Sequence, residues 1–143
     1  MSDSKSLPLA TRLNIRDNYE GPKPELSERL KKAAGGVEFN FVVDFVDLYQ
    51  NLEQNPDYRK RLGEVVFWYF EGLVRNLEDK LKDKMVLEAF IEAVSTRDII
   101  LELKSSESYY ELAIEKSTLY IRTSPNNFGC NAGEIGRDII DIL

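Results

Sequence analysis

The 143-residue sequence has no histidine and a single cysteine, Cys130. Without histidine, the chain cannot form a Ser-His-Asp triad, a histidine general base or a histidine-ligated metal site. One cysteine excludes an intrachain disulfide and a cysteine-cluster zinc site. Long apolar runs are also missing, because the longest, Val65 to Phe70, lies between two glutamates. A transmembrane helix needs about 20 apolar residues, so we expect no membrane segment.

The sequence also lacks targeting and cofactor motifs. Its first residues do not contain the apolar stretch of a secretory signal, so we expect a cytoplasmic protein. The glycines of residues 129–136 match neither a dinucleotide-binding motif nor a phosphate-binding loop. We therefore expect neither a cofactor nor a metal ion.

The charge is acidic overall and unevenly distributed. There are 25 acidic and 19 basic residues, which gives a net charge of −6. Residues 1–36 carry seven basic and five acidic groups, whereas residues 37–143 carry twelve and twenty. Phosphate binding needs clustered lysine and arginine, so this balance argues against nucleic acid and anionic membranes as partners. An acidic surface suits a basic protein partner and speeds their encounter.

The N-terminal third of the sequence divides near two prolines. Residues 1–24 have scattered apolar positions and end in Gly-Pro-Lys-Pro, so we expect an irregular N-terminal arm. Residues 25–143 form the single predicted domain, which begins with a helix over 25–34. Residues 37–41 alternate like a strand, but apolar residues at helical spacing favour a helix over about 40–54.

The segment from Asp57 to Lys82 has the strongest helical pattern. At 100° per residue, its apolar side chains fill an arc of roughly 200°. A surface helix has a narrower apolar stripe, so this helix is predicted to be central and contacted on several sides. A second amphipathic helix follows at about 83–95.

The C-terminal third reads as three strands and a helix. The strands are predicted at 99–103, 109–115 and 119–123, and their short connections favour an antiparallel meander. The last helix is expected over about 132–143, with Asn131 as its N-cap. The predicted fold is therefore α+β, with helices on one face of a small antiparallel three-stranded sheet, a central long helix and a C-terminal helix.

One polar stripe on the long helix is the predicted partner-binding site. Helical spacing places its five members in a line opposite the apolar arc: Arg61, Glu64, Trp68, Glu71 and Arg75. The only tryptophan lies in the middle of these charges. Because Trp and Arg are enriched at the positions that dominate binding energy, we expect something to dock on this stripe. The docking segment is either a partner or another part of the chain, such as the arm or the 25–34 helix.

A second group of residues is a candidate ligand pocket or loop. Tyr109, Tyr120 and Arg122 fall on the outward face of the predicted sheet. Cys130 and Asn131 precede the expected C-terminal helix.

Two classes of function remain. The favoured one is a non-enzymatic protein-interaction module, such as an adaptor, an inhibitor or a chaperone-like protein, with an acidic, aromatic-bearing surface. The alternative is a small-ligand-binding or enzymatic domain with an aromatic-lined pocket between the sheet and the long helix. Seven phenylalanines and seven tyrosines could line such a pocket. No residue is assigned a catalytic role.

Overall fold

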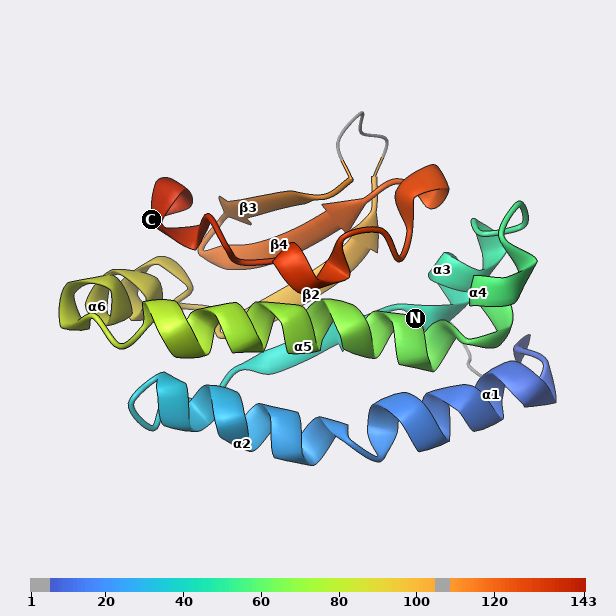
Figure 1. The fold of residues 1–143 in the computed structure, drawn as a ribbon, viewed down its shortest axis with the longest axis horizontal. Coiled ribbons are helices and arrows are strands. Elements are labelled where there is room, and N and C mark those ends of the chain that lie inside the picture. Colours follow the sequence, from blue (N-terminus) through green and yellow to red (C-terminus); the bar gives the residue numbers. More distant parts are fainter. Residues whose placement is uncertain (1–5, 105–108) are drawn as a thin grey trace.

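The protein has an α+β fold in which helices lie on one side of a four-stranded mixed sheet (Figure 1). The computed structural model describes residues 6–104 and 109–143. In the order β1-β2-β4-β3, the strands are β1 (Asn40–Val43), β2 (Asp98–Leu103), β4 (Thr118–Thr123) and β3 (Glu111–Glu115). β1, β2 and β4 run parallel to one another, and β3 pairs antiparallel with β4.

Most of the remaining described chain is helical. The helices are α1 (Leu9–Ile15), the π-helical turn η2 (Arg16–Glu20), α2 (Lys23–Ala33), α3 (Phe45–Gln50), α4 (Pro56–Lys60), α5 (Leu62–Lys80) and α6 (Lys84–Ala93). Three short 3-10 turns follow the sheet: η3 (Pro125–Asn127), η4 (Ala132–Glu134) and η5 (Ile139–Ile142). None of the helices in the described ranges is long and apolar enough to cross a membrane.

The α+β class is confirmed, but the predicted three-stranded antiparallel sheet is wrong in detail. β4 inserts between β2 and β3, so that β2 and β4 are parallel neighbours. The burial of the strands gives the reason. β4 is almost entirely buried and occupies a central position, whereas the half-buried β3 forms an edge. Short connections alone do not distinguish this order from a meander.

The fourth strand lies where a helix over about 40–54 is expected. Residues 40–43 pair with β2, and Phe41 lies opposite Ile99 on the buried face. Asp44 ends the strand and caps α3, because its Oδ1 accepts a hydrogen bond of 3.0 Å from the Asp47 N–H. The apolar residues at helical spacing therefore belong to a helix only from residue 45 onward.

The predicted irregular arm is also helical from residue 9 onward. Ile15 and Tyr19 are buried four residues apart, so α1 and η2 present an apolar side to the body of the protein. Pro22 and Pro24 do not keep the segment irregular, because they lie at the N-terminal end of α2, where a missing N–H costs no hydrogen bond. Residues 1–5 lie outside the described part of the chain.

α5 is the central helix, as its wide apolar arc predicts. α1, η2 and α2 pack along one of its sides and the η4 turn packs on another (Figure 1). Its fully buried large side chains are Leu62, Val65, Val66, Tyr69, Phe70, Leu73, Val74 and Leu77. The predicted single helix over 57–82 is nevertheless broken at Arg61, which separates α4 from α5. The Asn14 side chain accepts a hydrogen bond of 3.0 Å from the Glu64 N–H in the first turn of α5.

The predicted C-terminal helix over 132–143 is wrong. Asn131 has a left-handed backbone with φ of 54°, and its side chain caps no helix. Gly136 also has a positive φ, of 89°. The non-helical backbone of Ile135 and the left-handed Gly136 interrupt the helical path, and only the turns η4 and η5 form.

The turn between β3 and β4 offers a test of backbone strain. Lys116 and Ser117 both have positive φ, at 51° and 60°, which a two-residue hairpin of this kind requires. Asn-Gly suits these positions best, so we expect Lys116→Asn with Ser117→Gly to raise the free energy of unfolding by about 1 kcal/mol. Urea denaturation followed by circular dichroism measures the change. A loss of stability would contradict the turn geometry.

Candidate functional site

Ion pairs join neighbouring residues of the polar stripe predicted on α5, whose first member, Arg61, lies just before the helix. Arg61 Nε lies 2.7 Å from Glu64 Oε2, and Arg75 Nη1 lies 2.8 Å from Glu71 Oε1. Trp68 lies between these pairs and is half-buried. Each of the four charged stripe residues thus has an oppositely charged partner within the stripe.

Trp68 is partly covered by α4. The predicted arm and the 25–34 helix contact other members of the stripe, because the Asn14 side chain accepts a hydrogen bond from the Glu64 N–H and Arg29 Nη2 lies 3.8 Å from Glu71 Oε2. The Tyr58 ring meets the indole edge to face, with centroids 6.1 Å apart. The Arg61 guanidinium lies 5.3 Å from the indole centroid, within reach of a cation–π interaction. The indole therefore has a fixed wall on one side.

A groove of about 520 Å³ lies beside this indole. We call it the Trp68 groove. One wall comes from α5 and the other from the loop before η4 and from η4 itself. It is lined by Phe67, Trp68, Glu71, Arg75, Gly129, Asn131, Ala132 and Gly133.

The two walls are held together by close backbone contact and by hydrogen bonds. A Cβ at Gly72 would overlap the Ala132 carbonyl oxygen, so the glycine lets the loop touch the helix backbone. Arg75 Nη2 donates a hydrogen bond of 3.1 Å to the Gly133 carbonyl. Asn76 Nδ2 donates to the same carbonyl at 3.1 Å and to that of Ile135 at 2.7 Å. The groove is therefore a rigid feature.

A buried tyrosine fixes the other end of the loop. The Gly129 N–H donates a hydrogen bond of 2.7 Å to the Tyr69 hydroxyl oxygen, and that hydroxyl lies 3.4 Å from Thr123 Oγ1 at the end of β4. Burial raises the pKa of Tyr69 above its usual range. Tyr69 thus links the sheet, α5 and the groove.

The structure brings together residues from both predicted groups. Trp68, Glu71 and Arg75 of the stripe line the groove with Asn131 of the predicted loop. Cys130 precedes Asn131 in the loop and is half-buried, but it does not line the groove.

Tyr120 and Arg122 lie elsewhere, on the face of the sheet opposite to that of Ile121. The Arg122 guanidinium lies 4.4 Å from the Tyr120 ring centroid and makes two hydrogen bonds to Glu115, of 2.6 and 3.0 Å. This pairing lowers the pKa of Glu115 and raises that of Arg122. Tyr109 is exposed, and its carbonyl accepts a hydrogen bond from Thr123. The three residues form no common site with the Trp68 groove.

Sequence reasoning missed four lining residues, namely Phe67, Gly129, Ala132 and Gly133. Phe67 belongs to the apolar arc of α5 and offers no separate signal. A glycine in the middle of a helix is costly, so Gly72 is a signal in the sequence that another backbone approaches α5 there.

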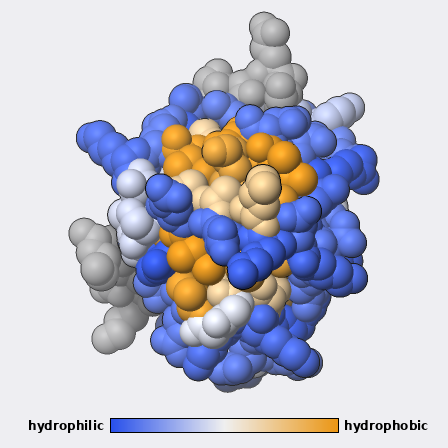
Figure 2. All heavy atoms as spheres, turned by 90° about the vertical axis from the view of Figure 1, so that its left-hand side faces the viewer, coloured by the Kyte–Doolittle hydropathy of each residue, from blue (hydrophilic) through white to orange (hydrophobic). Residues whose placement is uncertain are grey.

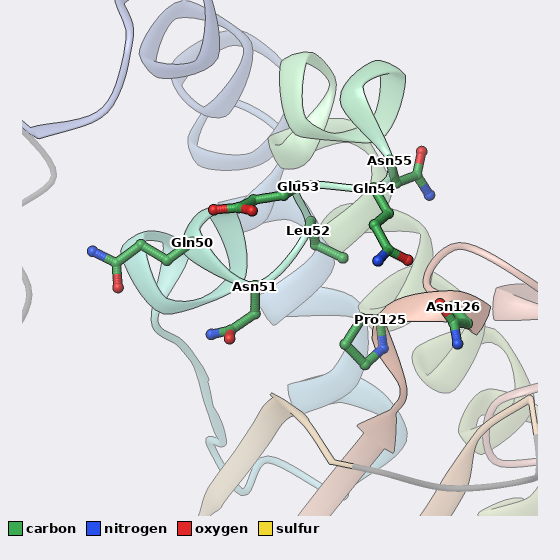
Figure 3. Close-up of a pocket in the computed structure, with 8 residues that line it drawn as sticks. All are labelled: Gln50, Asn51, Leu52, Glu53, Gln54, Asn55, Pro125 and Asn126. Atoms are coloured by element: carbon green, nitrogen blue, oxygen red, sulfur yellow. The ribbon is translucent and has the colours of Figure 1, made fainter.

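A second hollow, of about 470 Å³, lies between the 50–55 turn and η3 (Figure 3). Its lining is rich in side-chain amides, from Gln50, Asn51, Gln54, Asn55 and Asn126. In the close-up, Gln54 points toward Pro125, whereas Gln50 and Glu53 point away from it. These amides therefore do not converge on one point, and we assign the hollow no function.

An ion pair between α2 and α5, outside the stripe, predicts that the stability of the protein depends on pH. Arg29 Nη2 lies 2.6 Å from Glu78 Oε1, and the hydrogen bond from Arg29 lowers the pKa of Glu78. The unfolded chain therefore takes up a proton at Glu78 before the folded chain does, and the stabilisation is lost as the pH falls into the acid range.

We expect Glu78→Gln to cost less than about 1 kcal/mol at pH 7, because the carboxylate is partly exposed. Urea denaturation of both proteins at neutral and acidic pH measures the effect. The difference between them should shrink as the pH falls below the ordinary pKa of glutamate. A difference that is constant across this range would show that the ion pair is not the cause.

No protein family model, no curated protein and no solved structure matches this chain. Within residues 6–104 and 109–143, no three Asp, Glu or Cys side chains are grouped so that they could hold a metal ion. The protein thus has an α+β fold, and the Trp68 groove on its surface is the candidate functional site.

Proposed function

We propose that this protein is a non-enzymatic protein-interaction module, of the adaptor, inhibitor or chaperone-like kind, whose partner docks in the Trp68 groove. One observation carries the proposal. The only tryptophan of the chain lies half-buried in a rigid groove, with an arginine at each end of its stripe. Pre-formed pockets with Trp and Arg are typical of the positions that dominate binding energy.

The titratable groups support a binding role. General acid catalysis at neutral pH needs a carboxyl group whose pKa is raised by burial or by a like charge. Among the described carboxyl groups with a clearly shifted pKa, a neighbouring arginine lowers it in every case: Asp17, Glu64, Glu78 and Glu115. Both carboxylates of the stripe are likewise held by arginine.

The net charge of −6 supports a basic partner. The charges beside the groove are paired with each other, so the attraction would come from the whole acidic body rather than from single contacts at the groove. Such steering speeds association and weakens as salt screens it. We therefore expect the association rate, more than the dissociation rate, to fall with ionic strength.

The test compares Trp68→Ala with wild type in affinity capture from an extract of the native cells. Leu9→Ala is the matched control, because Leu9 is an exposed apolar residue on α1, away from the groove. Proteins that bind the groove should be captured by wild type and by Leu9→Ala but not by Trp68→Ala.

Each captured protein is then purified and titrated against wild type and against Trp68→Ala, so that the difference between the two titrations reports the fluorescence of Trp68, the only tryptophan of this chain. A shift in the emission with added partner is expected. Equal capture by all three proteins, with no change in emission, would show that the groove is not a docking site.

A further inference from the structure

α6 is a mostly apolar helix that the rest of the described chain covers only in part. Its sequence, KMVLEAFIEA, is mostly apolar, yet Phe90 is its only buried residue. Phe90 packs against Phe39, with ring centroids 5.2 Å apart. Met85 is 80% exposed, and Val86 and Leu87 are half-buried. Much apolar side-chain surface thus stays in contact with water, which is typical of an interface.

The exposed side of α6 has apolar flanks on both sides of a charged stripe. With Phe90 pointing inward, helical geometry places Lys84, Glu88 and Glu92 on the outer side. The flank with Leu87 faces the end of α2, because Leu87 Cδ2 lies 3.8 Å from the Cβ position of Gly35. The flank with Met85 therefore faces the other way. Figure 2 looks onto this end of the molecule and shows apolar side chains on both sides of a hydrophilic band.

The C-terminal turn η5 adds to the same surface. It lies at the same end of the molecule as α6, on the side away from α2 (Figure 1). Ile140 is 51% exposed and Leu143 is 36% exposed. The apolar surface of this end thus comes from α6 and η5 together. We call it the α6 face.

The charges of α6 indicate which partner fits the α6 face. Lys84 lies at the N-terminal end of the helix, and Glu88 and Glu92 lie toward its C-terminal end. When two such helices pack antiparallel with Lys84 of each opposite Glu88 of the other, two opposite-charge pairs form across the axis, and the apolar flanks of the two helices meet on either side of these charges. A two-fold axis makes each of these contacts twice. The pattern is therefore complementary to itself.

We propose that the α6 face binds a second copy of this chain, with the two α6 helices antiparallel about a two-fold axis. The proposal does not rest on the Trp68 groove, which is formed by α5 and the loop before η4. A dimer of this kind carries two separate copies of the groove.

The first test measures the oligomeric state by sedimentation velocity over a wide range of protein concentration. We expect wild type to form a dimer and Met85→Asp to weaken its association by at least about tenfold, which corresponds to about 1.4 kcal/mol. Leu9→Asp is the control, because Leu9 is 62% exposed but lies on α1. It should associate as wild type does. A wild type that stays monomeric at every concentration overturns the proposal, and so does a Met85→Asp variant that associates as tightly as wild type.

The second test reverses the charges. In Lys84→Glu, an acidic side chain lies opposite the glutamates of the second copy, so we expect like-charge repulsion to weaken association. Adding Glu88→Lys and Glu92→Lys to the same chain restores opposite charges across the axis and should restore the dimer. All of these positions are exposed, so the variants are expected to fold, which circular dichroism confirms. A folded triple variant that stays monomeric overturns the antiparallel arrangement.

Discussion

Replacing Gly72 with alanine is expected to lower the free energy of unfolding by about 3 kcal/mol. Gly72 is buried in the middle of α5, where the backbone of the η4 turn occupies the space that a side chain would need. The added methyl group would overlap the Ala132 carbonyl oxygen, which is a backbone atom and cannot move aside as a flexible side chain can. The turn must therefore lift from the helix, and the wall of the Trp68 groove moves with it.

Gly133→Ala is the control for this prediction. Gly133 lies in the same turn, but a Cβ there meets only the end of the Arg75 side chain, at 3.0 Å. A long side chain can move by a few tenths of an ångström, so we expect a cost below about 1 kcal/mol. Urea denaturation followed by far-ultraviolet circular dichroism compares the two variants. If Gly72→Ala is no less stable than Gly133→Ala, the close contact between α5 and the turn is wrong.

Replacing Phe70 with alanine is expected to cost about 3–5 kcal/mol, because it leaves a large cavity in the core. The Phe70 ring lies between two layers of the fold. Its centroid is 4.6 Å from that of Phe41 in β1 and 6.2 Å from that of Tyr19 in η2. Loss of the ring therefore loosens the contacts of α5 with both the sheet and the N-terminal helices.

Phe67→Ala tests whether burial is the cause. It removes the same side chain from the same helix, but Phe67 is half-buried and lines the Trp68 groove. We expect its cost to be less than half that of Phe70→Ala, because less apolar area returns to water and a smaller cavity remains. Thermal and urea unfolding of both variants provide the comparison. Equal losses would contradict the placement of these two rings.

The spacing of apolar residues predicts the positions of individual helices and strands, because each depends on residues close together in the sequence. The wide apolar arc identified α5 as central, and β-rich segments located β2 and β4 to within a residue or two. Strand order was beyond reach, because it depends on contacts between distant segments. β1 was missed because its four residues run directly into α3, so a helical spacing extends over both.

The candidate site was predictable only in halves. Helical spacing placed Trp68, Glu71 and Arg75 on one line, and the glycine-containing loop singled out Asn131. Nothing local indicates that the loop packs on that line, since the contact joins residues about sixty positions apart in the sequence. The C-terminal helix was predicted because Asn131 resembles an N-cap, whereas its left-handed backbone turns the chain along α5 instead.

The parallel pairing of β1 with β2 has a consequence for the speed of folding. Asn40 and Asp98 are hydrogen-bonded across 58 positions of the sequence, and Arg75 and Gly133 are joined across the same separation. The entropy of closing such loops is lost before the contacts that reward it are made. Despite its many helices, this chain should therefore fold at the pace of mixed α/β domains, well below the microsecond rates of simple helical bundles.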